Sequence, residues 1–198
     1  TFYVLTTPAE GATSVDLIMD SNIRTGGEAV KEATPTAEQK GLVAWITQTD
    51  YEREDVGGTK WSSNKDRNTF GPITAIEYLQ TATEGWTNVN PQTISTFTDD
   101  AGETHNMAKT YTVNARMPYY SEISNVSEST LYLIDYLSNY NEIAGRNGVS
   151  GVYGYWMLSS NASISDCAWF VDCIGYAVDD GVHFDGNHGA RPVINLSI

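Results

Sequence analysis

The sequence predicts an α+β domain in which helices flank a small antiparallel sheet and long loops connect the elements. Apolar runs typical of strands come first, segments with helical periodicity follow, and short runs separated by glycines fill roughly the last fifty residues. Strands and helices that are segregated along the chain favour this class over a parallel α/β sheet. The chain has 198 residues, 40% of them hydrophobic, so we expect residues 1–198 to form one domain with a full core.

The N-terminal part is expected to contain two strands and a helix. Residues 3–5 and 15–19 are short β-prone runs, and the segment between them is rich in turn-forming residues. Thr36 and Gln39 have the spacing of a capping box, and apolar residues then recur on one helical face. The sequence therefore predicts a first helix over residues 36–49.

The middle of the chain alternates between loops and helices. Residues 51–68 are polar and contain two adjacent glycines, which indicates a long surface loop. A second helix is predicted to begin at Pro72 and to end at Gly85, with an apolar stripe at helical spacing. Residues 87–110 are polar and rich in turn formers, and they are interpreted as an insertion or a hairpin.

The last third is expected to contain two more helices and then several strands. Pro118 precedes a segment that reads as the first turns of a helix, and residues 129–139 carry a second helical stripe. Glycines then separate four apolar runs that we interpret as the strands of a small antiparallel sheet: residues 153–158, 168–171, 182–184 and 192–196.

Charge and hydropathy exclude several classes of partner. Lysine and arginine total 11 against 25 acidic residues, so the net charge of −14 repels nucleic acid and anionic lipid. No apolar run is long enough for a membrane span, and no signal peptide is visible. We therefore expect no nucleic-acid partner and no membrane insertion, while the start at Thr1 leaves open whether a signal or anchor was removed.

The two cysteines leave three interpretations open. Cys167 and Cys173 could be unpaired thiols, a short-loop disulfide, or a metal or redox pair. His183 and His188 could complete a set of four ligands, but the intervals match no known zinc spacing. Aspartates from 179 to 185 have oxygen atoms suitable for calcium, yet no known calcium-binding spacing is present. We expect no metal and no cofactor.

Two stretches resemble a known family. The first, Arg116-Met117-Pro118-Tyr119-Tyr120-Ser121-Glu122-Ile123, resembles an element that opens a helix in the formylglycine-generating-enzyme branch of C-type lectin-like folds. The second, an ordered series, is similar to the terminal signature of a domain of unknown function found in gut bacterial surface and pilin-like proteins: Gly154-Tyr155-Trp156, Ala168-Trp169 and Gly189-Ala190-Arg191-Pro192-Val193-Ile194-Asn195-Leu196.

The resemblance implies a C-type lectin-like fold, and it covers residues 110–198 far better than the first hundred. Members of that group include ligand-binding proteins whose C-terminal loops are varied by diversity-generating retroelements. The resemblance thus implies an N-terminal scaffold with insertions in residues 1–110, and a lectin-like core in residues 111–198 with variable loops at about 158–190.

The composition of residues 158–190 is consistent with such variation. Adenine-directed mutation of asparagine codons never yields Lys, Glu, Gln, Met or Trp, and this segment contains no Lys, Glu, Gln or Met. An even distribution along the chain would place about five of these residues there. Turn-rich β segments also avoid lysine and glutamate, so this alternative explanation stays open.

The candidate site is a patch of mixed chemistry within this segment. Aromatic side chains offer contact area and carboxylates offer hydrogen-bond acceptors, so the patch could recognise a partner. The alternative is a solvated acidic loop that binds nothing. We expect exposed aromatic residues, Phe170 and Tyr176 above all, to be used in binding. The predicted variable, ligand-binding residues are Asp166, Cys167, Phe170, Asp172, Cys173, Ile174, Tyr176, Asp179, Asp180, His183, Asp185 and His188.

Three further residues of the C-terminal part are assigned to the scaffold. Trp156 and Trp169 lie in apolar runs with small neighbours, where a large aromatic side chain is most valuable to a sheet core. Arg191 belongs to the terminal signature described above. We expect these side chains to support the sheet rather than to contact a ligand.

The sequence predicts a binding protein rather than an enzyme. It contains no nucleophile elbow, no phosphate-binding loop and no zinc-protease motif, and His105 stands alone in a polar stretch. We expect an adhesin-like domain, outside the cell on a surface or pilus or on a phage particle, that presents its variable surface to a protein or glycan on another cell or host. The alternatives are a copper- or thiol-dependent oxidase of the formylglycine-generating type and a purely structural pilus or virion subunit.

Overall fold

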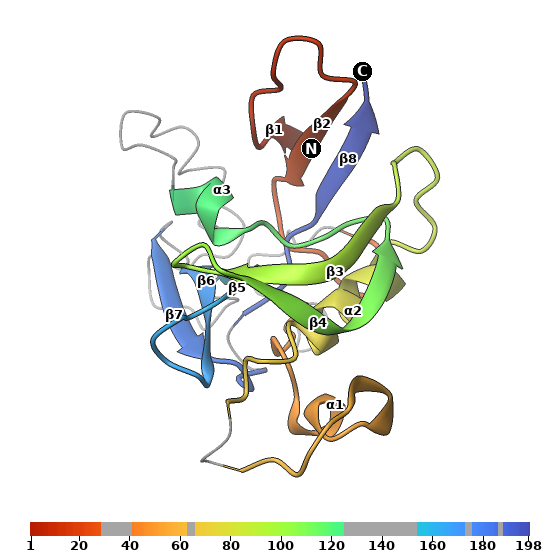
Figure 1. The fold of residues 1–198 in the computed structure, drawn as a ribbon. Coiled ribbons are helices and arrows are strands. Elements are labelled where there is room, and N and C mark those ends of the chain that lie inside the picture. Colours follow the sequence, from red (N-terminus) through yellow and green to blue (C-terminus); the bar gives the residue numbers. More distant parts are fainter. Residues whose placement is uncertain (29–40, 63–65, 125–153, 173–175, 186–187) are drawn as a thin grey trace, which may run out of the picture.

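A computed structural model describes residues 1–28, 41–62, 66–124, 154–172, 176–185 and 188–198. Within these ranges the protein is a mixed α/β structure built mostly of strands, with two sheets, three α-helices and one short 3₁₀ helix (Figure 1). The expected mixture of helices and strands in one chain is therefore confirmed. No helix in the described ranges is long and apolar enough to cross a membrane.

The smaller sheet joins the two ends of the described chain. It contains β1 (Phe2–Val4), β2 (Ser14–Met19) and β8 (Val193–Ser197) in the order β1-β2-β8, and all its pairings are antiparallel. Its strands stand apart from the larger sheet in Figure 1. The prediction that the last strand belongs to the same sheet as the other C-terminal strands is therefore wrong, because β8 pairs with an N-terminal strand instead.

The larger sheet is mixed rather than antiparallel. It contains β3 (Gln92–Asp99), β4 (Thr104–Val113), β5 (Gly154–Ser160), β6 (Cys167–Asp172) and β7 (Ala177–Gly181), in the order β4-β3-β5-β6-β7. The hairpin expected within residues 87–110 is confirmed as β3 and β4. The β3–β5 pairing is parallel, and every other pairing in this sheet is antiparallel.

Strand β5 is the centre of the structure because all seven of its residues are buried. Trp156 and Leu158 project into the larger core, while Tyr155 and Met157 project into a second apolar cluster on the opposite face. A strand that is buried on both faces reads as a continuous apolar run, as this one does. The whole larger sheet therefore rests on a strand that is shielded from water on both sides.

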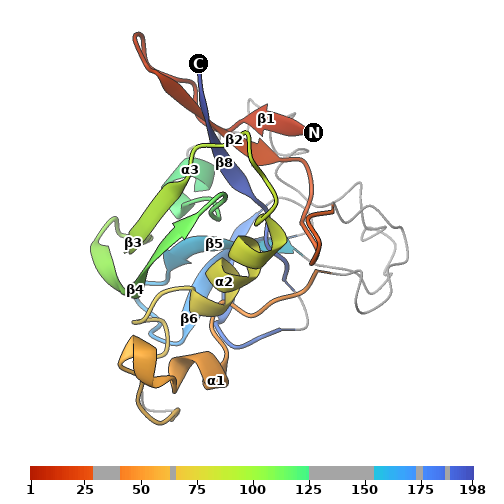
Figure 2. The same cartoon turned by 90° about the vertical axis from the view of Figure 1, so that its right-hand side faces the viewer.

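The helices cover parts of these cores. Helix α2 (Ile73–Ala82) begins after Pro72, as predicted, and its apolar stripe is buried in the larger core, in front of β5 and β6 in Figure 2. Helix α3 (Tyr120–Ser124) begins shortly after Pro118, also as predicted. Helix α1 (Gln48–Tyr51) is a single turn that begins at the end of the predicted helix 36–49. The 3₁₀ helix η2 (Glu54–Val56) is a single turn in the segment that was expected to be a loop.

The predicted helix over residues 36–49 is wrong for residues 41–47, and of its described residues only Gln48 and Thr49 are helical, at the start of α1. Residues 41–47 are not helical; the Val43 N–H donates to the His188 carbonyl at 2.9 Å, and the Ile46 N–H donates to the Val182 carbonyl at 3.0 Å. Pairing with the C-terminal segment therefore overrides the local helical periodicity. The strand expected at residues 182–184 is also wrong, because the Phe184 N–H closes a turn onto the Gly181 carbonyl. The helix expected at residues 129–139 lies outside the described residues.

Arg116 ties the two sheets and α3 together. Its guanidinium donates to both carboxylate oxygens of Glu122 at 2.6 and 2.8 Å and to an Asp16 carboxylate oxygen on β2 at 2.9 Å. Its backbone exchanges two hydrogen bonds with Val193 at the start of β8. Because only 6% of the Arg116 side chain is exposed, these partners replace most of its hydration.

We predict that the Arg116→Met variant loses about 3 kcal/mol of unfolding free energy, because two carboxylates lose their partner in a largely buried site. Urea denaturation followed by circular dichroism measures this loss. Lys109→Met is the matched control, since Lys109 is half-exposed and its partner Asp55 also binds Arg53. Equal losses in the two variants would contradict the assignment.

Candidate functional site

The candidate site lies along β7, which is the outer strand of the larger sheet among the described residues. Strand β7 pairs with β6 so that Phe170 is opposite Val178 and Trp169 is opposite Asp179. Because directly paired residues share a face of the sheet, Val178 lies on the face of Phe170 and Asp179 lies on the face of Trp169. The side chains of β6 pack against an apolar cluster on each face. The outer strand is thus supported by a packed neighbour.

Most of the predicted site residues that the structure describes are exposed or partly exposed. Tyr176 is 66% exposed, and Asp179, His183 and Asp185 are also exposed. Four others are half-buried at the same edge: Asp166, Cys167, Asp172 and Asp180. Sequence reasoning therefore placed eight described residues on one accessible edge, around β7 and the ends of β6.

The prediction of exposure is wrong for Phe170 and His188. Phe170 is 8% exposed and His188 is 2% exposed, and their ring centroids lie 3.8 Å apart. Both rings also contact Trp156, with centroids 5.8 and 4.5 Å from its ring. Phe170 has the same alternation phase as Ala168, which puts it on the face that covers the larger core. Cys173 and Ile174 lie outside the described residues.

The three residues assigned to the scaffold occupy the two cores. Trp156 is fully buried, and its indole N–H donates to the Val43 carbonyl at 2.7 Å. Trp169 is half-buried against Tyr120 of α3, with ring centroids 4.6 Å apart. The guanidinium of Arg191 lies 4.4 Å from the centre of the Tyr155 ring, and both side chains are fully buried.

Cys167 is a free thiol whose surroundings hold it in the protonated form. Partial burial, together with the carboxylates of Asp166, Asp179 and Asp180, raises its pKa to about 12. The thiolate is the form that attacks electrophiles and binds metals, so this cysteine is poorly suited to either task near neutral pH. In the described ranges no group of three or more His, Cys, Asp or Glu side chains is arranged to hold a metal ion.

Sequence reasoning missed a group of aromatic and basic side chains that lies beside the predicted patch. Trp61 lies edge-on to His183 with ring centroids 5.9 Å apart, and His183 stacks on Phe184 at 4.6 Å. Arg67 covers the Trp61 ring at 4.7 Å and lies 3.7 Å from a carboxylate oxygen of Asp166. The available signal was the tryptophan among basic residues in the segment 57–70, since the C-terminal segment carries the opposite charge.

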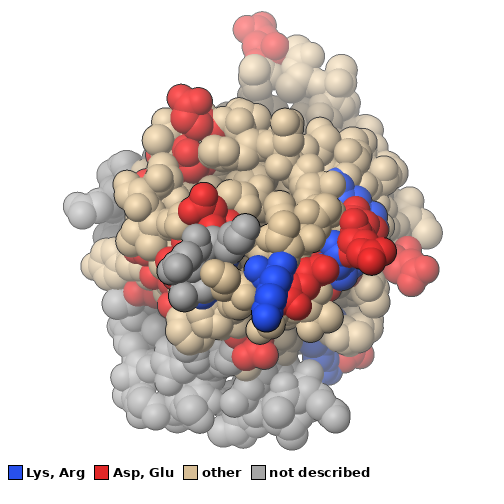
Figure 3. Space-filling model, turned by 60° about the horizontal axis from the view of Figure 1, so that its bottom comes forward, with Lys and Arg blue, Asp and Glu red and all other residues tan. Residues whose placement is uncertain are grey.

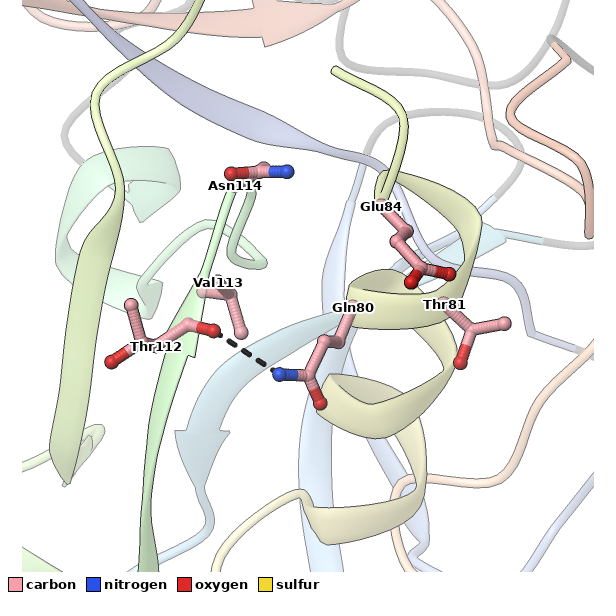
Figure 4. A pocket seen from close by; sticks show the side chains of 6 residues that line it. All are labelled: Gln80, Thr81, Glu84, Thr112, Val113 and Asn114. Carbon is pink, nitrogen blue, oxygen red and sulfur yellow. Dashed lines mark hydrogen bonds between the residues drawn. The ribbon is translucent and has the colours of Figure 1, made fainter. Parts of the chain in front are cut away.

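Two other hollows contain none of the predicted residues. One, of about 380 Å³, lies between α2 and β4 and is lined by polar side chains and one valine (Figure 4): Gln80, Thr81, Glu84, Thr112, Val113 and Asn114. The other, of about 220 Å³, contains the pair Asp99 and His105, whose Oδ2 and Nε2 atoms are 3.0 Å apart. His105 also stacks on Phe97, so it is held as part of a local structure.

Comparison with protein-family models, with curated proteins and with solved structures found no match to this chain. We therefore infer the function from the geometry and chemistry described above.

His188 couples the core to the outer strand through one hydrogen bond. Its Nε2–H donates to Asp180 Oδ2 at 2.9 Å, while the buried Nδ1 atom has no hydrogen-bond partner among the described residues. Burial lowers the pKa of His188 and outweighs the opposing effect of Asp180. The folded protein therefore binds a proton at His188 less readily than the unfolded chain does.

We predict that the unfolding free energy falls as the pH drops below about 6.5, the ordinary pKa of an unfolded histidine. The unfolded state gains a proton there that the folded state resists, so the stability present above that pH is lost on acidification. The His188→Gln variant keeps an amide donor for Asp180 and removes the titration. Its stability should fall less than that of the original chain between about pH 7 and pH 5.5, by urea denaturation; identical slopes would contradict the prediction.

Proposed function

We propose that this chain is a C-type lectin-like recognition domain that acts by binding and presents a variable surface along β7 to a partner outside the cell. The observation that carries the proposal is that the C-terminal segment contains two separate sets of side chains, one buried in the cores and one exposed. Strand β5 is buried throughout, whereas Tyr176, Asp179, His183 and Asp185 project from the supported outer edge. Folding and partner choice therefore depend on different side chains.

The composition of residues 158–190 supports the variable-surface part of the proposal. The segment lacks Lys, Glu, Gln and Met, and the exposed positions hold residues that asparagine codons can yield by adenine mutation. The start of α3 supports the resemblance to C-type lectin-like folds. Arg116 and Glu122, which both belong to the motif that carries this resemblance, form a bidentate ion pair there. Both observations are independent of the identity of the partner.

The exposed side chains suit the recognition of a partner without catalysis. Tyr176 offers a large ring with a hydroxyl and only two side-chain torsions to restrict, so its ordering costs little entropy. The neighbouring carboxylates accept hydrogen bonds from a partner and discriminate by charge. Since the neighbouring strand β6 packs against an apolar cluster on each face, binding at the β7 edge requires little rearrangement of the backbone. We place the domain on a cell surface, a pilus or a phage particle.

The two alternatives receive less support. An oxidase of the formylglycine-generating type needs reactive thiolates, and the raised pKa of Cys167 keeps that sulfur protonated near neutral pH. A purely structural subunit does not account for a composition consistent with variation at exposed positions such as Tyr176, Val178 and Phe184. We therefore retain binding as the proposed function.

The variable-surface proposal predicts what lies beside the gene. The adjacent DNA should contain a near-copy of the end of the coding region that differs from it chiefly at adenines, next to a reverse-transcriptase gene. The differing codons should map to exposed residues between 158 and 190 and spare Trp156 and Trp169. Sequencing the locus in related isolates checks this, and variation spread evenly over α2 and β5 would contradict it.

We predict that Tyr176→Ala weakens binding by about tenfold or more, because truncation of an exposed aromatic anchor removes most of its contact area. The intact chain is first applied to arrays of glycans and cell-surface proteins, and the strongest binder is then titrated against each variant. Ile198→Ala is the matched control, since Ile198 and Tyr176 are 67% and 66% exposed. Loss of binding in both variants, or in neither, would contradict a site at β7.

A further inference from the structure

The exposed apolar side chains of this protein are concentrated at the proposed site. Within the described ranges, six large hydrophobic side chains are well exposed, and four of them are Ile164, Tyr176, Val178 and Phe184. The other two, Val4 and Ile198, lie near the chain ends. Isolated exposed apolar residues need no explanation, but a concentration on one segment is typical of an interaction surface. We call Ile164, Asp166 and the exposed residues of 176–185 the β7 surface.

The charges that the C-terminal segment contributes to the β7 surface are all negative. Between Leu158 and Ala190 the chain has five aspartates and neither lysine nor arginine. Arg67 reaches Asp166 at 3.7 Å and His188 binds Asp180, but no ion pair reaches Asp179 or Asp185 from the described residues. Three of the carboxylates raise the pKa of the Cys167 thiol, which is a direct effect of the negative potential at this edge.

Several of the other cations in the described ranges are already engaged with the protein's own acids. On the face around α1, Lys and Arg side chains lie among Asp and Glu (Figure 3). Arg53 contacts Asp50, Asp55 and Glu77, and Lys109 contacts Asp55. A second copy of this chain, with a net charge of −14, would be repelled from the β7 surface. The surface therefore complements a partner of opposite charge.

We propose, on the basis of the function proposed above, that the β7 surface binds a protein whose contact surface combines Lys or Arg side chains with apolar ones. The aspartates attract and orient the cationic groups, and the four apolar side chains supply the buried contact. A neutral glycan fits less well, because it offers no cationic group to the aspartates and little apolar surface to the aliphatic side chains of Ile164 and Val178. The proposal thus selects a protein partner from the two classes that the sequence left open.

The test uses a random peptide library displayed on phage and selected on the immobilised full chain. Selected peptides should contain an excess of Lys or Arg together with Leu, Ile or aromatic residues. A variant with Asp166→Asn, Asp179→Asn and Asp185→Asn should bind them about tenfold or more weakly in about 50 mM NaCl, and the difference should shrink in about 500 mM NaCl. Thermal unfolding of the variant checks that it folds as the original chain does.

The matched control changes the net charge equally at a distance from β7. It combines Glu10→Gln, Glu84→Gln and Glu103→Gln, since all three side chains are exposed and lie outside the C-terminal segment. We expect it to retain affinity within about threefold, because screening limits the influence of distant surface charges. Equal weakening by both triple variants would overturn the proposal, since it would mean that net charge alone drives binding.

Three other outcomes are also decisive. Peptides without excess positive charge whose binding needs Tyr176 would overturn this inference and leave the proposed recognition function intact. Tyr176-dependent binding of glycans, with no peptide selected, would do the same. If neither a peptide nor a glycan binds in a manner that depends on Tyr176, the recognition function fails as well.

Discussion

The ion pairs of Arg116 are the constraint on which the arrangement of this molecule depends. The largely buried guanidinium of Arg116 joins β2 to α3, and the Arg116 backbone bonds the start of β8, so that parts of the chain far apart in sequence meet at one residue. The Glu122 carboxylate also accepts the Tyr119 N–H at 2.7 Å, and this bond fixes the start of α3. Helix α3 in turn places Tyr120 against Trp169 of β6, directly beside the outer strand. The charge network thus links the two sheets' ends to the strand beside the edge at which we propose binding.

The burial of β5 separates folding from recognition, and the corrected positions define the boundary between the two. Phe170 and His188 were expected to contact a ligand, but they pack on Trp156 beneath the edge. A variable surface built on this sheet can change Tyr176 or Asp179 without disturbing either core. Changes at Phe170 must keep a residue of similar size and polarity, because a cavity beside Trp156 destabilises the fold.

Local patterns could predict the elements that local interactions decide. The helix after Pro72, the β3–β4 hairpin and the strand at β5 follow from proline placement, turn residues and a continuous apolar run. The helix over residues 36–49 could not be corrected from sequence, since Val43 and Ile46 pair with residues far along the chain. For the site, strand alternation alone could have assigned Phe170 to the core with Ala168. The position of Trp61 beside His183 depends on tertiary packing, which no local pattern encodes.

The carboxylates at the β7 surface fall into two groups with different tolerance to change. Asp166 and Asp180 interact with Arg67 and His188, side chains that are mostly buried and come from other segments. Loss of Asp180 would leave the buried Nε2–H of His188 without an acceptor, at a cost of about 1–3 kcal/mol. No ion pair within the described ranges holds Asp179 or Asp185, so their substitution carries no comparable penalty. We therefore expect substitutions that preserve folding to concentrate at Asp179 and Asp185, because ion pairs restrict the other carboxylates of this edge.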